Sequence, residues 1–225
     1  MLPAAQRGWL GFAGVLAASA VVLLGILHAD DSRPGAADVR VGALVDGARP
    51  SWWQRAALAA DFLGEPVGAA VLVLAVVTGC LLLRRPRAAV LVVAGAGLTV
   101  VTTTLLKHVV GRTINGGYLS YPSGHTAFLT ALAVSLTLLA IGGAGRTAGA
   151  LLVSTAALAA GAVMGWAQVA LGAHYPTDVL GGWCTALAVT PATAWLVDRT
   201  ADAAGARPAD RGPRTRLDPP DMPRR

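Results

Sequence analysis

Six long apolar stretches constrain this chain more than any other feature. They cover residues 9–27, 67–83, 88–106, 123–141, 148–171 and 179–197. A helix needs about 20 apolar residues to cross the hydrocarbon core of a bilayer, and in lipid only helices or closed barrels satisfy the backbone. Charged residues make up 13% of the chain, against about 25% in soluble domains. We therefore predict an all-α membrane protein, a bundle of six transmembrane helices.

The polar segments divide the chain into three parts. Residues 1–55 should form a first transmembrane helix, too long for the apolar core of a signal peptide, and an external loop that allows a short helix. Residues 56–198 should form the main membrane domain, which an interfacial helix over residues 55–63 introduces. Residues 199–225 are rich in Arg and Pro and poor in apolar residues, which predicts a disordered basic tail.

Basic residues set the predicted orientation. Six spans place both termini on one side of the membrane, and that side carries 12 of the 18 Lys and Arg residues. Three of them lie in the short turn Arg84-Arg85-Pro86-Arg87, which is typical of a cytoplasmic loop. We expect a multi-pass plasma-membrane protein with cytoplasmic termini. No interleaving of basic and aromatic residues suggests a nucleic-acid partner.

The stretch Tyr121-Pro122-Ser123-Gly124-His125 opens the fourth apolar stretch on the external side. Pro fits the entrance of a helix, Ser123 is a good N-cap, and Gly124 allows close approach to the backbone. Free N–H groups and the positive end of the helix dipole favour an anion such as phosphate. A serine hydrolase centred on Ser123 is less favoured, because the G-x-S-x-G setting is lacking.

Two further external stretches carry candidate chemistry. His174 and Asp178 are four residues apart, so the carboxylate can orient the ring as a nucleophile; the alternative is a His and an Asp that only cap a helix. His125 is a candidate general acid, or an interfacial His without a task. Lys107 and Arg112 lie just past the third stretch and are candidate phosphate ligands, or cations that snorkel at a helix end.

A metal site is not expected. His125, His174 and Asp178 could be imagined around a metal ion, but neither HExxH nor a histidine-rich cluster is present. We predict no metal and no cofactor.

Together these residues resemble the type 2 phosphatidic acid phosphatase family, whose relatives include the vanadium haloperoxidases. The family carries three motifs, K-x6-R-P, P-S-G-H and S-R-x5-H-x3-D. The second is intact here as residues 122–125, the third keeps His174 and Asp178, and the first keeps Lys107 with Gly111-Arg112 as a variant. The resemblance covers roughly residues 64–197.

Two arginines of the family pattern are missing. The Arg-Pro of the first motif falls on Ile114-Asn115, and the Ser-Arg of the third falls on Ala167-Gln168. Each charged hydrogen bond to a bound anion is worth roughly 1.5–3 kcal/mol, so their loss should weaken phosphate binding. Arg112 is the nearest candidate to compensate, and Gln168 can still donate a neutral hydrogen bond.

The resemblance implies a metal-independent hydrolase acting on a lipid phosphate or polyprenyl (pyro)phosphate at the external membrane face. His174 would form a phosphohistidine, Asp178 would orient it, and His125 would protonate the leaving group. Further residues would hold the phosphate, namely Lys107, Arg112, Ser123, Gly124 and Gln168. The alternatives are a weak or inactive member that binds lipid phosphates or assists envelope assembly, and a transporter, which the lack of charges within the spans disfavours. The sequence predicts neither the lipid nor the oligomeric state.

Overall fold

The computed structural model describes residues 4–46, 52–141 and 147–205. They form eight helices and one two-stranded hairpin. The elements are α1 (Ala4–Leu27), α2 (Ala36–Asp46), α3 (Trp53–Phe62), α4 (Pro66–Leu82), α5 (Pro86–Val110), β1 (Thr113–Ile114), β2 (Tyr118–Leu119), α6 (Gly124–Ile141), α7 (Thr147–Ala170) and α8 (Pro176–Gly205). The all-α class is confirmed, since each strand has only two residues.

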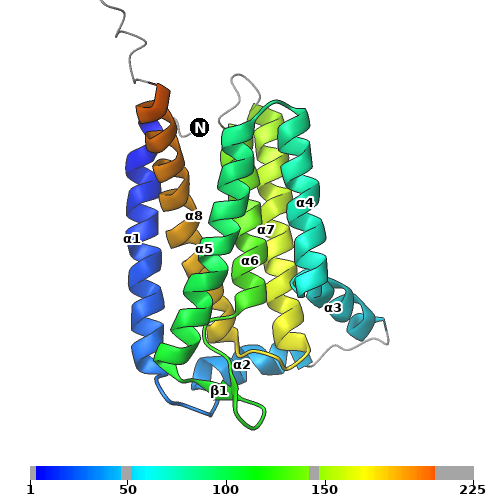
Figure 1. The fold of residues 1–225 in the computed structure, drawn as a ribbon. Helices are drawn as coiled ribbons and strands as arrows, with labels where there is room; N and C mark the ends of the chain where they lie inside the picture. The colour runs from blue at the N-terminus through cyan, green and yellow to red at the C-terminus, as the bar shows by residue number, and fades with distance from the viewer. Residues whose placement is uncertain (1–3, 47–51, 142–146, 206–225) are drawn as a thin grey trace, which may run out of the picture.

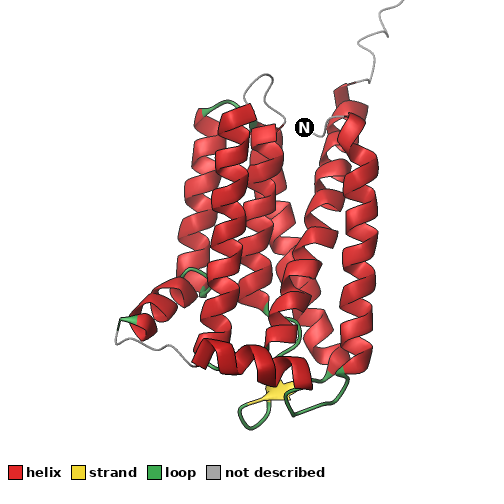
Figure 2. Cartoon of the chain, turned by 180° about the vertical axis from the view of Figure 1, so that it is seen from behind, coloured by secondary structure: helices red, strands yellow, loops and turns green. Residues whose placement is uncertain are grey.

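The long helices α1 and α4 to α8 stand side by side as a bundle (Figure 1). The short helices α2 and α3 and the hairpin gather at one end of this bundle, as the view from behind also shows (Figure 2). The start of α1 and the end of α8 lie at the other end. The three candidate stretches join helices at the α2 end, so the topology brings them together.

Helix boundaries follow local chemistry. Proline occupies the first turn of α4, α5 and α8, where its missing N–H costs nothing. Gly111 ends α5 in the left-handed region with φ of 67°, which glycine adopts without a steric penalty. Between α3 and α4 the chain bends by 64°. This bend turns α3 across the end of the bundle.

The core lies among α5, α6 and α7. Its central cluster contains Val92, Ala96, Phe128, Leu129, Leu132 and Met164, against which side chains of α4 pack. Many large apolar side chains are exposed instead of buried, among them Trp9, Phe12, Val71, Leu74, Val90 and Val101. An apolar exterior of this extent fits a lipid environment and supports a membrane protein.

Six spans are not confirmed. By length and composition, three described helices can cross a membrane, within residues 8–27, 86–110 and 176–204, and the bent pair α3–α4 raises this to four. The apolar parts of α6 and α7, Gly124–Ala140 and Leu158–Ala170, are shorter, with 10–17 residues each. The sequence prediction treated every apolar stretch as a full span.

Two predicted boundaries were wrong. The helix α8 continues to Gly205, so the first residues of the predicted disordered tail are helical, and Arg199 stacks over the ring of Trp195 at 4.4 Å. Residues 206–225 of that tail lie outside the described residues. Lys107 lies within the last turn of α5, not in the loop after it. That loop also forms the β1–β2 hairpin, in which Thr113 pairs with Leu119 and Ile114 with Tyr118.

The first helix packs closely on the main membrane domain. It lies along α8 in both views (Figures 1 and 2). The Tyr121 hydroxyl donates a hydrogen bond of 2.7 Å to the Val21 carbonyl oxygen of α1. The loop that opens α6 is thus fixed to α1.

Candidate active site

His174 sits in the turn between α7 and α8 and is almost buried, with 8% of its surface exposed. Its Nδ1 lies 3.7 Å from Oδ2 of Asp178, in the first turn of α8. This distance is longer than a hydrogen bond, but it places the carboxylate beside the ring. Burial lowers the pKa of His174 below its ordinary value of 6.5, while Asp178 opposes the shift. The ring therefore favours the neutral form, which a nucleophile requires.

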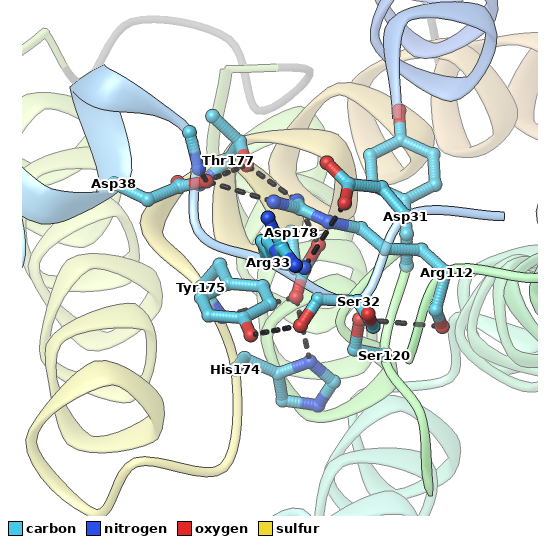
Figure 3. A network of polar contacts seen from close by, with 12 residues as sticks. Asp31, Ser32, Arg33, Asp38, Arg112, Ser120, His174, Tyr175, Thr177 and Asp178 are labelled. Atoms are coloured by element: carbon cyan, nitrogen blue, oxygen red, sulfur yellow. Dashed lines mark hydrogen bonds and ion pairs between the residues drawn. The ribbon is translucent and has the colours of Figure 1, made fainter. Parts of the chain in front are cut away.

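Arg112 lies between two carboxylates. Its side chain is fully buried, and its Nη1 donates to Asp178 Oδ1 at 2.7 Å and to the Thr177 hydroxyl at 2.6 Å. Its Nη2 donates to Asp38 Oδ2 at 2.8 Å. Figure 3 shows the guanidinium between these carboxylates. Both terminal nitrogens of Arg112 therefore have protein partners, whereas its buried Nε has none among the described residues. The role of Arg112 as a replacement phosphate ligand stays a prediction.

Asp38 comes from α2, the short helix of the segment predicted as an external loop that allows one. Its Oδ1 accepts the Thr177 N–H at 2.9 Å, in the first turn of α8, so a side chain from α2 caps α8. Burial by itself raises the pKa of Asp38, but hydrogen bonds from Arg112 and Thr177 outweigh it and hold the pKa below 3.8. Asp38 is therefore a buried carboxylate that stays ionised.

Tyr175 and the chain after α1 close over Arg112. The Tyr175 ring lies 4.5 Å from the Arg112 guanidinium carbon, and its hydroxyl donates to the Ser32 carbonyl at 3.2 Å. Burial raises the pKa of this phenol, so it remains a donor. The Tyr175 N–H donates to Asp178 Oδ2 at 3.0 Å. Asp178 is thus fixed through both carboxylate oxygens.

The turn that opens α6 behaves as the sequence predicts. The Thr126 N–H donates to the Ser123 hydroxyl at 3.4 Å, which makes Ser123 the N-cap. The Ser123 N–H donates to the Asp178 carbonyl at 2.9 Å. A Cβ at Gly182 of α8 would lie 2.5 Å from the Ser123 carbonyl oxygen, so only glycine permits this approach. The second and third motifs are therefore in direct contact.

His125 lies on the other side of the site and is more open than His174, with 28% of its side chain exposed. Its Nε2 lies 3.7 Å from Asp61 Oδ1 and 3.7 Å from Glu65 Oε1, at the bend between α3 and α4. A Cβ at Gly64 would overlap the His125 ring. The bend thus forms a close seat for this ring, with two carboxylates facing it.

The other predicted phosphate ligands have protein partners too. Lys107 Nζ donates to the Leu119 carbonyl at 2.9 Å. Gln168 Nε2 donates to Asp61 Oδ1 at 2.6 Å, so it links α7 to the seat of His125. Asn115, at a position where the family has Pro, donates to the Gly172 carbonyl at 2.7 Å. The hairpin is thereby tied to the turn that carries His174.

Among the described residues, one group of side chains could hold a metal ion, and it differs from the one weighed from the sequence. Ligand atoms of Asp61, Glu65 and His125 lie within 4.8 Å of one another. A carboxylate–imidazole set of this kind suits divalent cations of borderline hardness. Asp178, by contrast, is bonded to Arg112, so His174 and Asp178 belong to a different cluster.

Sequence reasoning missed Asp38, Asp61 and Glu65. Asp61 and Glu65 are spaced i, i+4 across Gly64, next to an apolar stretch, which is a signal for a paired site at the membrane face. Asp38 opens an otherwise weakly patterned helix and has no sequence signal for its partner 74 residues away.

The arrangement is suited to a two-step transfer of an anionic group. One histidine is buried and faces a carboxylate, and a second is more exposed beside two carboxylates. A helix N-terminus lies between the motifs. Such a set can supply a nucleophile, a proton carrier and an anion seat.

Comparison with known proteins identifies the frame. The sequence profile of the PAP2 superfamily matches residues 69–202. The fold is similar to the crystal structure of the first transmembrane PAP2 type phosphatidylglycerolphosphate phosphatase from Bacillus subtilis, with a TM-score of 0.69 and 20% sequence identity. That match covers 85% of this chain and 97% of the other. The comparison with curated protein sequences gave no match.

The matched profile covers more than half of the chain and includes all three candidate motifs. The helical bundle agrees with a solved member of the same type over nearly its whole length. The chain belongs to the PAP2 superfamily.

Proposed function

We propose that this protein is a membrane-embedded, metal-independent phosphatase that hydrolyses a lipid phosphate through a phosphohistidine on His174. The observation that carries the proposal is the buried His174, whose Nδ1 faces Asp178 and whose pKa is lowered by burial. A ring oriented in this way is left with Nε2 for attack on phosphorus. The second histidine of the site, His125, belongs to the intact second motif.

In the first step, the lone pair of His174 Nε2 forms a bond to phosphorus while the bond from phosphorus to the leaving oxygen breaks. His125 donates a proton to that oxygen, so the lipid departs as an alcohol or a monophosphate. In the second step, His125 takes a proton from water as the water oxygen attacks phosphorus. The phosphorus–nitrogen bond breaks, and inorganic phosphate leaves with His174 restored.

The phosphate would be held mainly by neutral and dipolar groups. The Gly124 N–H and its neighbours at the start of α6 point out of the helix end, Ser123 caps it, and Lys107 supplies a positive charge. Gln168 would contribute a neutral donor after turning from Asp61. Arg112 would contribute at most through Nε, because its two terminal nitrogens make three bonds within the protein.

The substrate class follows from the membrane setting. A lipid with a phosphate head group can keep its tails in the bilayer while the head group reaches the α2 end of the bundle. The similar solved structure is a phosphatidylglycerolphosphate phosphatase, so this lipid heads the substrates to test, followed by phosphatidic acid and polyprenyl phosphates. The basic turn at residues 84–87 favours an external site, since it lies at the other end of the bundle.

The test is phosphate release by the purified protein in detergent with EDTA. The panel contains phosphatidylglycerolphosphate, phosphatidic acid, polyprenyl pyrophosphate and polyprenyl phosphate, with His174→Ala as the matched control. We expect release that requires His174 and ranks the lipids. Equal release by both proteins would overturn the proposal.

A lipid-phosphate binder without turnover is the second candidate. Ile114 and Gln168 replace the two family arginines, and Arg112 is committed to carboxylates. Binding of fluorescent lipid phosphates by wild type and His174→Ala separates the two cases. A binder retains equal affinity in both proteins and releases no phosphate from any lipid of the panel.

A further inference from the structure

The ion cluster around Arg112 contains more negative than positive charge. Asp38, Arg112 and Asp178 have no exposed side-chain surface, and the guanidinium is 2.8 Å from one carboxylate and 2.7 Å from the other. Two carboxylates and one guanidinium leave one net negative charge. A buried net charge is costly unless a counter-charge or a task compensates for it.

His174 is the group that this charge faces. Its ring becomes positive when Nε2 bonds phosphorus while Nδ1 keeps its proton. If Arg112 paired with Asp178 alone, the pair would be neutral and would offer the ring little stabilisation. Asp38 pairs with the other side of the guanidinium, so Asp178 retains its effect on the ring (Figure 3).

We propose that Asp38 is a positioning residue of the reaction, which acts through Arg112 so that the buried Asp38–Arg112–Asp178 triad presents one net negative charge to His174. Asp38 also holds the first turn of α8 through the Thr177 N–H, and thereby the backbone that carries Asp178. The proposal rests on the phosphatase function above. It gives the helix α2 a catalytic purpose.

Other charged groups near His174 do not replace this charge. Those that face the ring or its neighbours are Lys107 on α5, His125 on α6, and Asp61 and Glu65 at the α3–α4 bend. Lys107 disfavours a positive ring, and the two carboxylates face His125 instead. Among the described residues, Asp178 is the carboxylate next to His174, and Asp38 sets its net effect.

The test compares Asp38→Asn with the double variant Asp38→Asn/Arg112→Gln. The single variant makes the triad neutral, and the double variant restores one net negative charge on Asp178. We expect Asp38→Asn to lower kcat about tenfold with KM within about threefold, and to move the acid limb of the pH–rate profile about half a unit or more to lower pH. The double variant should recover both the limb and part of kcat.

Two controls separate charge from shape. Asp31→Asn removes a carboxylate from the same segment, where the Asp31 side chain accepts the exposed Arg33 N–H, and should change neither quantity. Asp38→Glu keeps the charge on a longer side chain and should keep the limb in place even if kcat falls. An unmoved limb in Asp38→Asn, or a double variant no better than the single one, overturns the proposal.

A readout without turnover keeps the two proposals separable. The chain has four histidines, and His174→Ala identifies the signal of His174 in NMR spectra of protein labelled with 15N-histidine. Titration of that signal should have its midpoint at lower pH in Asp38→Asn than in wild type. If wild type releases no phosphate, the proposed function fails while this shift still decides whether Asp38 sets the charge at His174. An unshifted midpoint overturns the proposal.

Discussion

The two histidines of the site each face a carboxylate at 3.7 Å, yet their surroundings are opposite. His174 is nearly buried, and its partner Asp178 is held by Arg112, the Tyr175 N–H and the turn of α8. His125 is about one-quarter exposed, and its partners Asp61 and Glu65 come from a bend in the chain. The His–carboxylate pair is therefore buried at His174 and partly exposed at His125.

The difference matches the two tasks that we propose. A nucleophile gains from one fixed orientation and a neutral ring, which burial provides. A proton carrier must lose and regain a proton in every cycle, and His125 Nε2 faces two carboxylates but makes no hydrogen bond to the described residues that would fix its proton. Experiments that treat the two histidines alike can therefore break or sharpen this contrast.

The largest expected effect is on the covalent intermediate. His174→Ala should lower turnover by at least about 10³-fold and abolish a base-stable phosphoenzyme, because the nucleophile is gone. His125→Ala should lower turnover by about 10²–10⁴-fold but still form the phosphoenzyme, which then accumulates because water is not activated. Rapid quench with 32P-labelled lipid phosphate measures both. If His174→Ala still forms a 32P-labelled phosphoenzyme, His174 is not the nucleophile.

Loss of the carboxylate next to His174 should lower kcat more than loss of a carboxylate next to His125. Asp178→Asn should lower kcat by about 10²–10⁴-fold, because the amide leaves Arg112 underpaired and fails to hold the ring. Asp61→Asn should lower kcat only about tenfold, since Glu65 still faces His125. Steady-state kinetics of both variants on one lipid provides the measurement. Equal losses would show that the open side is as strictly organised as the buried one.

The seat of His125 can be tested without touching a polar group. Gly64→Ala adds a methyl group that would overlap the imidazole. A displacement of about 1 Å costs up to about 10²-fold in rate, so kcat should fall while the thermal midpoint changes little. Gly97→Ala on α5 is the matched control, because a Cβ there meets nothing within 4 Å. Unchanged activity in Gly64→Ala would remove the bend from the catalytic geometry.

The pH dependence tests the buried side. Burial keeps the pKa of His174 below 6.5, and the protonated ring cannot attack phosphorus. Activity should therefore be retained as the pH falls to 6.5 and be lost only below it. The profile of kcat/KM against pH for the wild type reports this limb. A limb midpoint above 6.5 assigned to His174 would contradict the neutral, buried nucleophile.

The smallest effect expected is that of chelators. EDTA should change turnover by less than about twofold, because the proposed steps use no metal. If Mn²⁺ or Zn²⁺ instead restores activity after chelation, the cluster of Asp61, Glu65 and His125 is the place to examine. Glu65→Gln would then abolish the metal dependence, whereas in a metal-free enzyme it should reduce turnover only slightly.

The sequence predicted much of the frame because periodic apolar runs and helix-start residues act locally. The apolar stretches at residues 67–83 and 88–106 correspond to the helices α4 and α5, and the N-cap of Ser123 is confirmed. The contact between His174 and Asp178 follows from their spacing on one turn. The family resemblance is likewise confirmed.

The contacts that could not be predicted are interactions that sequence spacing does not encode. Arg112 lies where a phosphate ligand is expected, but its partners Asp38 and Asp178 are 74 and 66 residues away. Gln168 was assigned to phosphate, yet it bonds to Asp61, 107 residues away. Composition predicted a disordered tail from Arg199, whereas stacking on Trp195 and packing of α8 extend the helix.

The bond from the Tyr121 hydroxyl to the Val21 carbonyl joins residues 100 positions apart, and this separation is also an interval of time. A ribosome adding about 5–20 residues per second makes Val21 roughly 5–20 s before Tyr121. During that interval α1 must stay in the bilayer near the site of synthesis, without the loop it will hold. The helix made last, α8, then brings the nucleophile's carboxylate to a partly assembled site. The site that we propose is thus completed only when α8 is in place.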